Sequence, residues 1–141
     1  MSNILLLEDD EDLAQVLSQW LDSEDISLEV CHDGHEGYAR LMKGHYDLVI
    51  LDWSLPGLSG LEICQKYRSI QGSTPFLMLS GRSAIVDITR CLDAGVDDYL
   101  VKPFNPRELS ARIKALTRRA AGNVWGQLHQ SVCQDPIATH D

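Results

Sequence analysis

Short apolar runs alternate with stretches of helical periodicity through most of the chain. The run ILLL at residues 4–7 is apolar throughout, and the run DLVIL at residues 47–51 is nearly so. Strands without polar positions are typical of a parallel sheet covered by helices on both faces. We therefore expect strands at residues 4–7, 27–31, 47–51, 76–79 and 98–101.

Between these runs, apolar residues recur at helical spacing. Leu13, Leu17 and Leu21, for example, lie on one side of an expected helix. The expected helices cover residues 11–21, 34–44, 59–70, 83–94 and about 105–119. Five strand–helix units predict an α/β fold with a doubly wound five-stranded parallel sheet of order 2-1-3-4-5, a flavodoxin-like (βα)5 sandwich.

The composition limits the kinds of partner. The 141 residues include 12 Lys and Arg and 21 Asp and Glu, for a net charge of −9. Such a field disfavours non-specific contact with nucleic acid or membrane surfaces. The chain lacks an apolar stretch of about 18 residues and a basic leader, so we expect no membrane span. Its four cysteines form no CxxC pair and predict reduced thiols in a cytoplasmic protein, three of them in or near the core.

The helical pattern fails after Arg119. We expect one domain at residues 1–120, followed by a tail or the start of a linker at 121–141. In the alternative that stays open, Val124, Trp125 and Leu128 form an amphipathic turn that docks on the domain or on a partner.

Polar side chains follow four of the expected strands. They are Glu8, Asp9 and Asp10 after the first, Asp52 after the third, Ser80 after the fourth and Lys102 after the fifth. In doubly wound sheets, ligands bind beyond the carboxyl ends of the strands, where the strand order reverses. These groups are therefore expected to meet at one rim of the sheet.

The acidic groups at this rim predict a cation site. Carboxylates on adjacent strands repel one another unless a cation or protons neutralise them. Hard oxygen ligands with open positions suit Mg²⁺. The competing interpretation of residues 8–10 is a solvated helix start, where acids are favoured, and Asp10 is expected to cap the first helix.

Asp52 stands at the tip of the expected central strand. A carboxylate there can attack phosphorus and form an acyl phosphate. Lys102 can pair with the phosphoryl oxygens and Ser80 can donate a hydrogen bond to them. Alternatively, Lys102 is an ordinary surface lysine and Ser80 caps the next helix.

Four segments together resemble the receiver domain of two-component response regulators, a CheY-like family. They are LLLEDDEDL, DLVILDWSLPGLSGLE, TPFLMLSGRS and AGVDDYLVKPF, within residues 3–119. The resemblance implies that Glu8 and Asp9 are the acidic pair and that Asp52 is the phosphoacceptor. It also implies that these three residues and the backbone carbonyl of Ser54 bind Mg²⁺. It further implies a phosphate-binding Lys102 that precedes a cis proline, a switch hydroxyl on Ser80 and a switch aromatic on Tyr99, for which packing on the fourth helix is the alternative.

The resemblance also implies partners and an output. The phosphoryl group would come from a sensor histidine kinase or a phosphotransfer protein. The last third is similar to the OmpR/PhoB-like class, which dimerises through helix 4, strand 5 and helix 5 and regulates transcription through a linked DNA-binding domain. Charges at Asp97, Asp98 and Arg112 could pair between protomers. A stand-alone receiver that acts by protein–protein contact is the alternative.

Gly81 and Arg82 depart from the family pattern in an instructive way. Gly81 follows the switch serine and is expected to leave the approach to Asp52 open and the loop mobile. Arg82 and Ser54 flank the expected path of an attacking water and are predicted to tune self-dephosphorylation.

Two other protein classes would need residues that this chain lacks at the corresponding positions. A flavodoxin-like cofactor protein would need a Ser/Thr/Gly phosphate loop where this chain has acids. An aspartyl phosphohydrolase would resemble Asp-x-Asp, but Ser54 stands in place of the second acid. We therefore expect a switch that catalyses only its own phosphorylation and self-dephosphorylation and is not a turnover enzyme.

Overall fold

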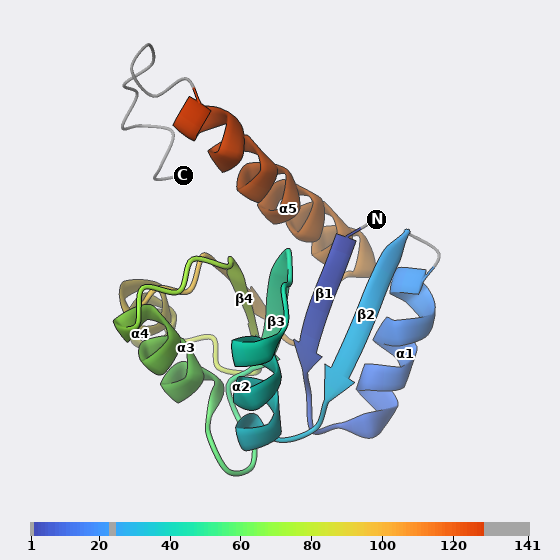
Figure 1. Ribbon diagram of the computed structural model, residues 1–141. Helices are drawn as coiled ribbons and strands as arrows, with labels where there is room; N and C mark the ends of the chain where they lie inside the picture. Colours follow the sequence, from blue (N-terminus) through green and yellow to red (C-terminus); the bar gives the residue numbers. More distant parts are fainter. Residues whose placement is uncertain (1, 23–24, 129–141) are drawn as a thin grey trace.

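The computed structural model describes residues 2–22 and 25–128, with side chains to residue 118. Its strands are β1 (Ser2–Leu7), β2 (Ile26–Cys31), β3 (Leu48–Asp52), β4 (Phe76–Ser80) and β5 (Asp98–Val101). Its helices are α1 (Glu11–Asp22), α2 (Gly34–Lys43), α3 (Gly60–Ser69), α4 (Ile85–Ala94) and α5 (Pro106–Leu128). The strands form one parallel sheet of order β2-β1-β3-β4-β5, which confirms the predicted fold class (Figure 1).

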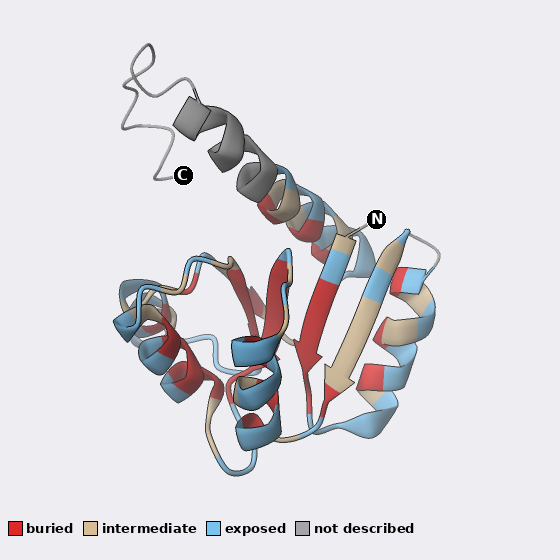
Figure 2. Ribbon diagram, in the orientation of Figure 1, coloured by how far each residue is buried: buried red, intermediate tan, exposed pale blue. Residues whose placement is uncertain are grey.

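The helices cover the two faces of the sheet in unequal groups. On one face, alternate strand residues such as Leu5 and Leu51 pack with buried residues of α2, α3 and α4. On the other, residues such as Ile4 and Ile50 pack with α1 and α5. This alternation follows from the period of two in a strand, and it explains why β3 and β4 carry no polar residue before their last position. Figure 2 shows the contrast between the buried central strands and the half-buried edge strand β2.

The helix ends use the side chains that the sequence offers. The carboxylate of Asp10 accepts a hydrogen bond from the Leu13 N–H, so the expected cap of α1 is confirmed. Asn105 likewise accepts from the Arg107 N–H at the start of α5. Gly95 ends α4 in the left-handed conformation, with φ of 113°, where a residue without Cβ is favoured.

The end of α5 differs from the prediction. The helix continues to Leu128, whereas the sequence pattern indicated an end near residue 119. Its last turns project past the sheet at the end where the strands begin (Figure 1). Gly122 costs only about 1 kcal/mol relative to alanine inside a helix, and no proline follows before residue 136, so nothing in this segment forces a stop. The side chains of the suggested amphipathic turn at residues 124–128, and Cys133, lie outside the described part.

Several other boundaries shift by one or two residues. Asp52 and Ser80 are the last residues of β3 and β4 and do not follow them. Strand β1 begins at Ser2 and not at residue 4, and α4 begins at Ile85 and not at residue 83. Cys31, Cys64 and Cys91 are buried and free, as predicted.

Candidate functional site

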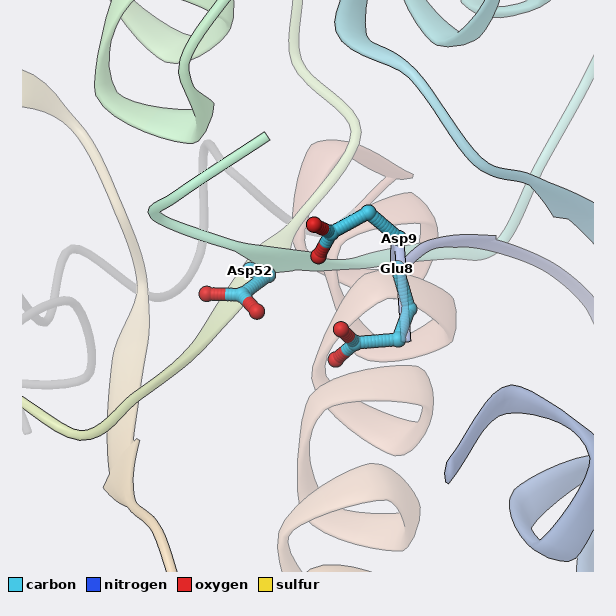
Figure 3. A group of neighbouring side chains, drawn as sticks. All are labelled: Glu8, Asp9 and Asp52. Carbon is cyan, nitrogen blue, oxygen red and sulfur yellow. The ribbon is translucent and has the colours of Figure 1, made fainter. Parts of the chain in front are cut away.

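Three carboxylates from two neighbouring strands meet at the carboxyl end of the sheet. Strands β1 and β3 pair directly, with Leu7 opposite Leu51, so the residues that come next share one edge. Glu8, Asp9 and Asp52 each place a carboxylate oxygen within 4.8 Å of the others (Figure 3). The predicted convergence of these acids at one rim is therefore present in the structure.

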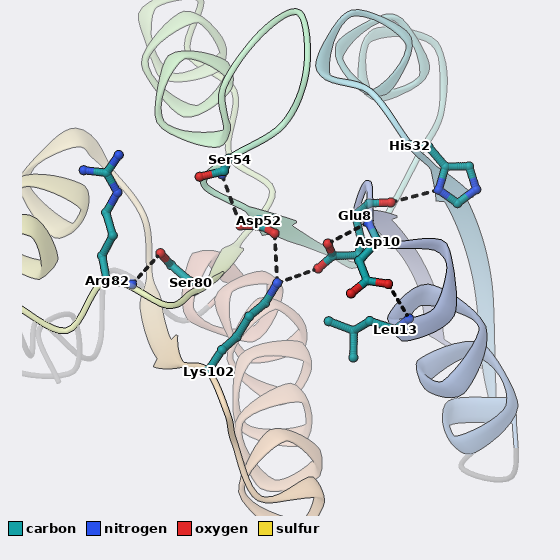
Figure 4. Close-up of polar contacts among 9 residues, drawn as sticks. All are labelled: Glu8, Asp10, Leu13, His32, Asp52, Ser54, Ser80, Arg82 and Lys102. Atoms are coloured by element: carbon teal, nitrogen blue, oxygen red, sulfur yellow. Dashed lines mark hydrogen bonds and ion pairs between the residues drawn. The ribbon is translucent and has the colours of Figure 1, made fainter.

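The ammonium group of Lys102 lies between two of these acids. Its Nζ donates to Oδ2 of Asp52 at 2.8 Å and to Oε1 of Glu8 at 2.9 Å (Figure 4). The backbone N–H of Lys102 donates to the carbonyl of Ser80, the last residue of the neighbouring β4. The peptide to Pro103 is cis, as the resemblance implied. The hydrogen bonds to Asp52, Glu8 and Ser80 hold Lys102 at the rim, so it is not an ordinary surface lysine.

Burial sets the electrostatics of Glu8. Its side chain is 1% exposed, and this burial raises the pKa of Glu8 to about 7, against the hydrogen bonds from Lys102 and the Asp10 N–H. Burial also acts to lower the pKa of Lys102, but the hydrogen bonds to Asp52 and Glu8 raise it above its ordinary value. Lys102 therefore keeps its positive charge beside the acids.

The two serines take different positions around Asp52. Ser54 is exposed, and its backbone N–H donates to Oδ1 of Asp52 at 3.1 Å. Ser80 is buried, and its Oγ accepts a hydrogen bond from the Arg82 N–H at 3.0 Å. Ala84 occupies the N-cap position of α4, so the alternative of Ser80 as a helix cap is wrong.

Tyr99 points into the protein. Its side chain belongs to the core cluster that includes Cys91 of α4, and its hydroxyl donates to the backbone carbonyl of Arg82 at 2.8 Å. The ring therefore packs against α4 and also contacts the loop that follows Ser80. The alternative, packing on the fourth helix, is therefore present, whereas the role of Tyr99 as the switch aromatic stays a prediction.

Two contacts at the site were not foreseen from the sequence. Trp53, which directly follows Asp52, is buried, and the guanidinium carbon of Arg82 lies 4.3 Å from the centroid of its ring. His32 contacts the backbone carbonyl of Glu8 through Nδ1 at 2.8 Å. His32, His35 and His45 are all exposed.

Comparison with known families places this geometry in context. Residues 4–114 match the family of the response regulator receiver domain. The chain belongs to this family. The receiver match covers β1 from residue 4 on, all of β2 to β5 and the first part of α5.

Relatives of this receiver are found among curated proteins and solved structures. Response regulator ArlR of Staphylococcus aureus is 44% identical over 119 residues, which are 84% of this chain and 54% of the relative. The chain thus spans about half the length of the curated relatives it matches. The receiver domain of Francisella response regulator 1452 has a TM-score of 0.82 at 30% identity, covering 84% of this chain and 98% of that one. The BeF3-activated N-terminal receiver domain of Klebsiella pneumoniae RstA has a TM-score of 0.78 at 28% identity, covering 82% and 98%.

The α4–β5–α5 face of the receiver carries charges that are already paired within the chain. Arg112 of α5 contacts Asp98 at 2.7 Å and Glu108 at 2.9 Å. Asp97, which precedes β5, pairs with Arg68 of α3 at 3.0 Å. A pairing of these groups between protomers would therefore have to replace contacts that the single chain satisfies.

None of the helices in the described ranges 2–22 and 25–128 is long and apolar enough to cross a membrane.

Proposed function

We propose that this receiver is a phosphoacceptor switch of a two-component phosphorelay, in which Asp52 takes a phosphoryl group from a partner. The observation that carries the proposal is the meeting of three carboxylates and one ammonium group at a single rim. Glu8, Asp9 and Asp52 offer negative charge for a metal, and Lys102 offers positive charge for phosphoryl oxygens. The family is a family of signalling switches, which agrees with this role.

The donor set suits Mg²⁺. Carboxylate oxygens are hard ligands, and opposite ligands of one octahedral magnesium ion lie about 4 Å apart. The oxygens of Glu8, Asp9 and Asp52 lie within 4.8 Å of one another, so small side-chain movements would bring them onto one ion. The backbone carbonyl of Ser54 is the further ligand that we propose. Bound Mg²⁺ would offset negative charge on the phosphoryl group during its transfer.

The reaction itself needs little from the protein beyond position and charge. A carboxylate oxygen of Asp52 forms a bond to phosphorus while the bond from phosphorus to the donor histidine nitrogen breaks. The Lys102 ammonium, 2.8 Å from that carboxylate, pairs with a phosphoryl oxygen. A serine hydroxyl that accepts one hydrogen bond can still donate its own hydrogen, and we assign this role to Ser80.

The phosphoryl group would then shift the equilibrium between two conformations of the chain. In the favoured conformation, Ser80 and Lys102 contact the phosphoryl oxygens and Tyr99 lies inward. The α4–β5–α5 face then changes its preference for a partner, which can be a second copy of this chain. The donor would be a sensor histidine kinase or a phosphotransfer protein, and we expect no direct contact with nucleic acid by this domain.

We further propose that the output is transcriptional and lies outside the receiver. The matched part of ArlR is 54% of that response regulator, which leaves room for an effector domain in a protein of that kind. Residues 1–120 would then be the receiver and residues 121–141 a tail or the start of a linker. A stand-alone receiver that acts through protein contacts is the second candidate.

Incubation with Mg²⁺ and acetyl phosphate tests the proposal. We expect one phosphoryl group per chain, stable in acid and labile in base, formed in the presence of Mg²⁺ and suppressed by EDTA. Sustained hydrolysis of a phosphomonoester would instead indicate a phosphohydrolase. A chromophore that co-purifies and absorbs like a flavin would indicate a cofactor protein.

A further inference from the structure

Arg82 makes four contacts that join separate parts of the switch. Its backbone N–H donates to Ser80 Oγ at 3.0 Å, and its carbonyl accepts from the Tyr99 hydroxyl at 2.8 Å. Its guanidinium carbon lies 4.3 Å from the centroid of the Trp53 ring. The same guanidinium lies 3.9 Å from the carboxylate of Asp87, in the first turn of α4.

The loop around Arg82 has few other restraints. Residues 81–84 are all exposed. Apart from Gly81 and its two chain neighbours, no heavy atom of the described residues lies within 4 Å of the point where a side chain at Gly81 would begin. Ala84, at the N-cap position of α4, has no polar side chain that could cap the helix. The side-chain contacts of Arg82 are therefore a large part of what fixes this loop.

Helix α4 itself buries few side chains. Of its ten residues, all described, Cys91 is the one that is buried. Ile85 and Val86 at its start are 77% and 73% exposed. An element with so few buried side chains moves at low cost in free energy. Contacts at its first turn, such as that between Arg82 and Asp87, then have a large effect on its position.

Trp53 gives Arg82 a fixed partner. The residue is 5% exposed, and its backbone carbonyl accepts hydrogen bonds from the N–H groups of Leu55 and Gly60. Because Trp53 directly follows Asp52, the last residue of β3, the position of its ring depends on the position of that strand end. A cation over the face of a tryptophan ring is attracted to it, more strongly than over tyrosine or phenylalanine.

From these contacts we propose that Arg82 is a latch: its stacking on Trp53 fixes the loop after β4 and so holds Tyr99 inward before any phosphoryl group is present. Arg82 is a positioning residue in this account, since it acts through the carbonyl that the Tyr99 hydroxyl contacts. The inference rests on the proposed role of Tyr99 as the switch aromatic. In this proposal, the contact between Arg82 and Trp53 sets the fraction of unphosphorylated chains in which Tyr99 is already inward.

The test is ¹⁹F NMR of the full chain labelled with fluorotyrosine, with the Tyr99 signal assigned by Tyr99→Phe. Without phosphodonor, Arg82→Gln should shift the ratio of inward to outward Tyr99 about two- to fivefold toward outward, as loss of a partly exposed cation–π contact predicts. Arg82→Lys should keep most of the wild-type ratio, because it retains the cation. Arg90→Gln, which changes an exposed arginine of α4, is the matched control and should have no effect.

Trp53→Leu supplies an independent arm. It should shift the Tyr99 ratio as Arg82→Gln does, and the double variant should shift it no further than either single variant. The latch is overturned by a wild-type ratio in Arg82→Gln, by equal shifts in Arg82→Gln and Arg82→Lys, or by shifts that add in the double variant. Labelling of the wild-type chain by acetyl phosphate is measured separately. If it fails, the proposed function fails, while the Tyr99 ratios still decide the latch.

Discussion

The Nζ of Lys102 lies 2.9 Å from Oε1 of Glu8, although the two residues are 94 positions apart in the chain. Glu8 is nearly inaccessible, so its carboxylate depends on this ammonium group for charge compensation when no metal is bound. The same Nζ serves Asp52, which makes Lys102 the common partner of two acids that would otherwise repel each other. Loss of this one side chain should therefore affect stability as well as phosphoryl transfer.

We predict that Lys102→Ala lowers the free energy of unfolding by ~1–3 kcal/mol at pH 8 without metal. The estimate is below that for a fully buried pair because Lys102 is 23% exposed. The loss should be smaller at pH 5, where Glu8 is protonated, since burial raises its pKa to about 7. Urea denaturation at the two pH values measures both effects. Lys43→Ala, an exposed lysine at the end of α2, is the control, and equal losses in the two variants would argue against this role for Lys102.

Glu8→Gln should change how stability depends on pH in the absence of metal. Glu8 has an ordinary pKa of 4.5, and burial raises it to about 7 in the folded chain. Protonated Glu8 therefore contributes to the free energy of unfolding. This contribution is fully present below pH 4.5 and is lost as the pH rises through about 7. Between pH 4.5 and pH 8, the stability of Glu8→Gln should rise relative to wild type by ~2–3 kcal/mol. Denaturation in EDTA across this range checks it, with the exposed Glu11→Gln as control, and a difference that does not vary with pH would refute it.

Asp9→Asn should separate metal binding from folding. Asp9 is exposed, so its replacement should change the stability of the metal-free chain by less than ~0.5 kcal/mol. Mg²⁺ at about ten times its dissociation constant should stabilise the wild-type chain by ~1.4 kcal/mol and Asp9→Asn by much less. Thermal melts with and without Mg²⁺ make the comparison. Asp12→Asn, a neighbouring exposed acid outside the cluster, should respond like wild type, and an undiminished Mg²⁺ response in Asp9→Asn would exclude it as a ligand.

Much of the fold and the site follows from the order of residues alone. The apolar runs predict the strands, because a strand buried on both faces leaves few alternatives. Once the sheet is parallel with order 2-1-3-4-5, the residues after β1 and at the end of β3 must share an edge. The proximity of Glu8 and Asp52 was predictable for this reason.

Contacts that depend on side-chain conformation could not be predicted in the same way. The sequence placed Lys102 at the rim but did not reveal that its ammonium group bridges Glu8 and Asp52. The stacking of Arg82 on Trp53 joins segments that belong to different strand–helix units, and no periodicity connects them. The predicted end of α5 near residue 119 is wrong because the loss of an amphipathic pattern does not by itself end a helix; α5 continues to Leu128, since no residue in this segment breaks it.

The close approach of Gly60 to the acceptor strand gives a further prediction. A Cβ at residue 60 would lie 2.2 Å from the backbone carbonyl oxygen of Asp52, so the strand end or α3 would have to move. Gly60→Ala should lower the free energy of unfolding by ~1–3 kcal/mol. Gly81→Ala is the matched change, because open space surrounds that position, and it should alter stability by less than ~1 kcal/mol. Chemical denaturation of both variants decides the point, and equal effects would contradict it.

The identity of the acceptor is the central claim, and mass spectrometry tests it most directly. The wild-type chain and Asp52→Asn, each treated with acetyl phosphate and Mg²⁺, are compared as intact proteins and after proteolysis. We predict one phosphoryl group on the peptide that contains Asp52 in the wild type, and none in Asp52→Asn, which should remain folded by circular dichroism. Labelling of folded Asp52→Asn at wild-type stoichiometry, or a wild-type label located on another peptide, would contradict the account.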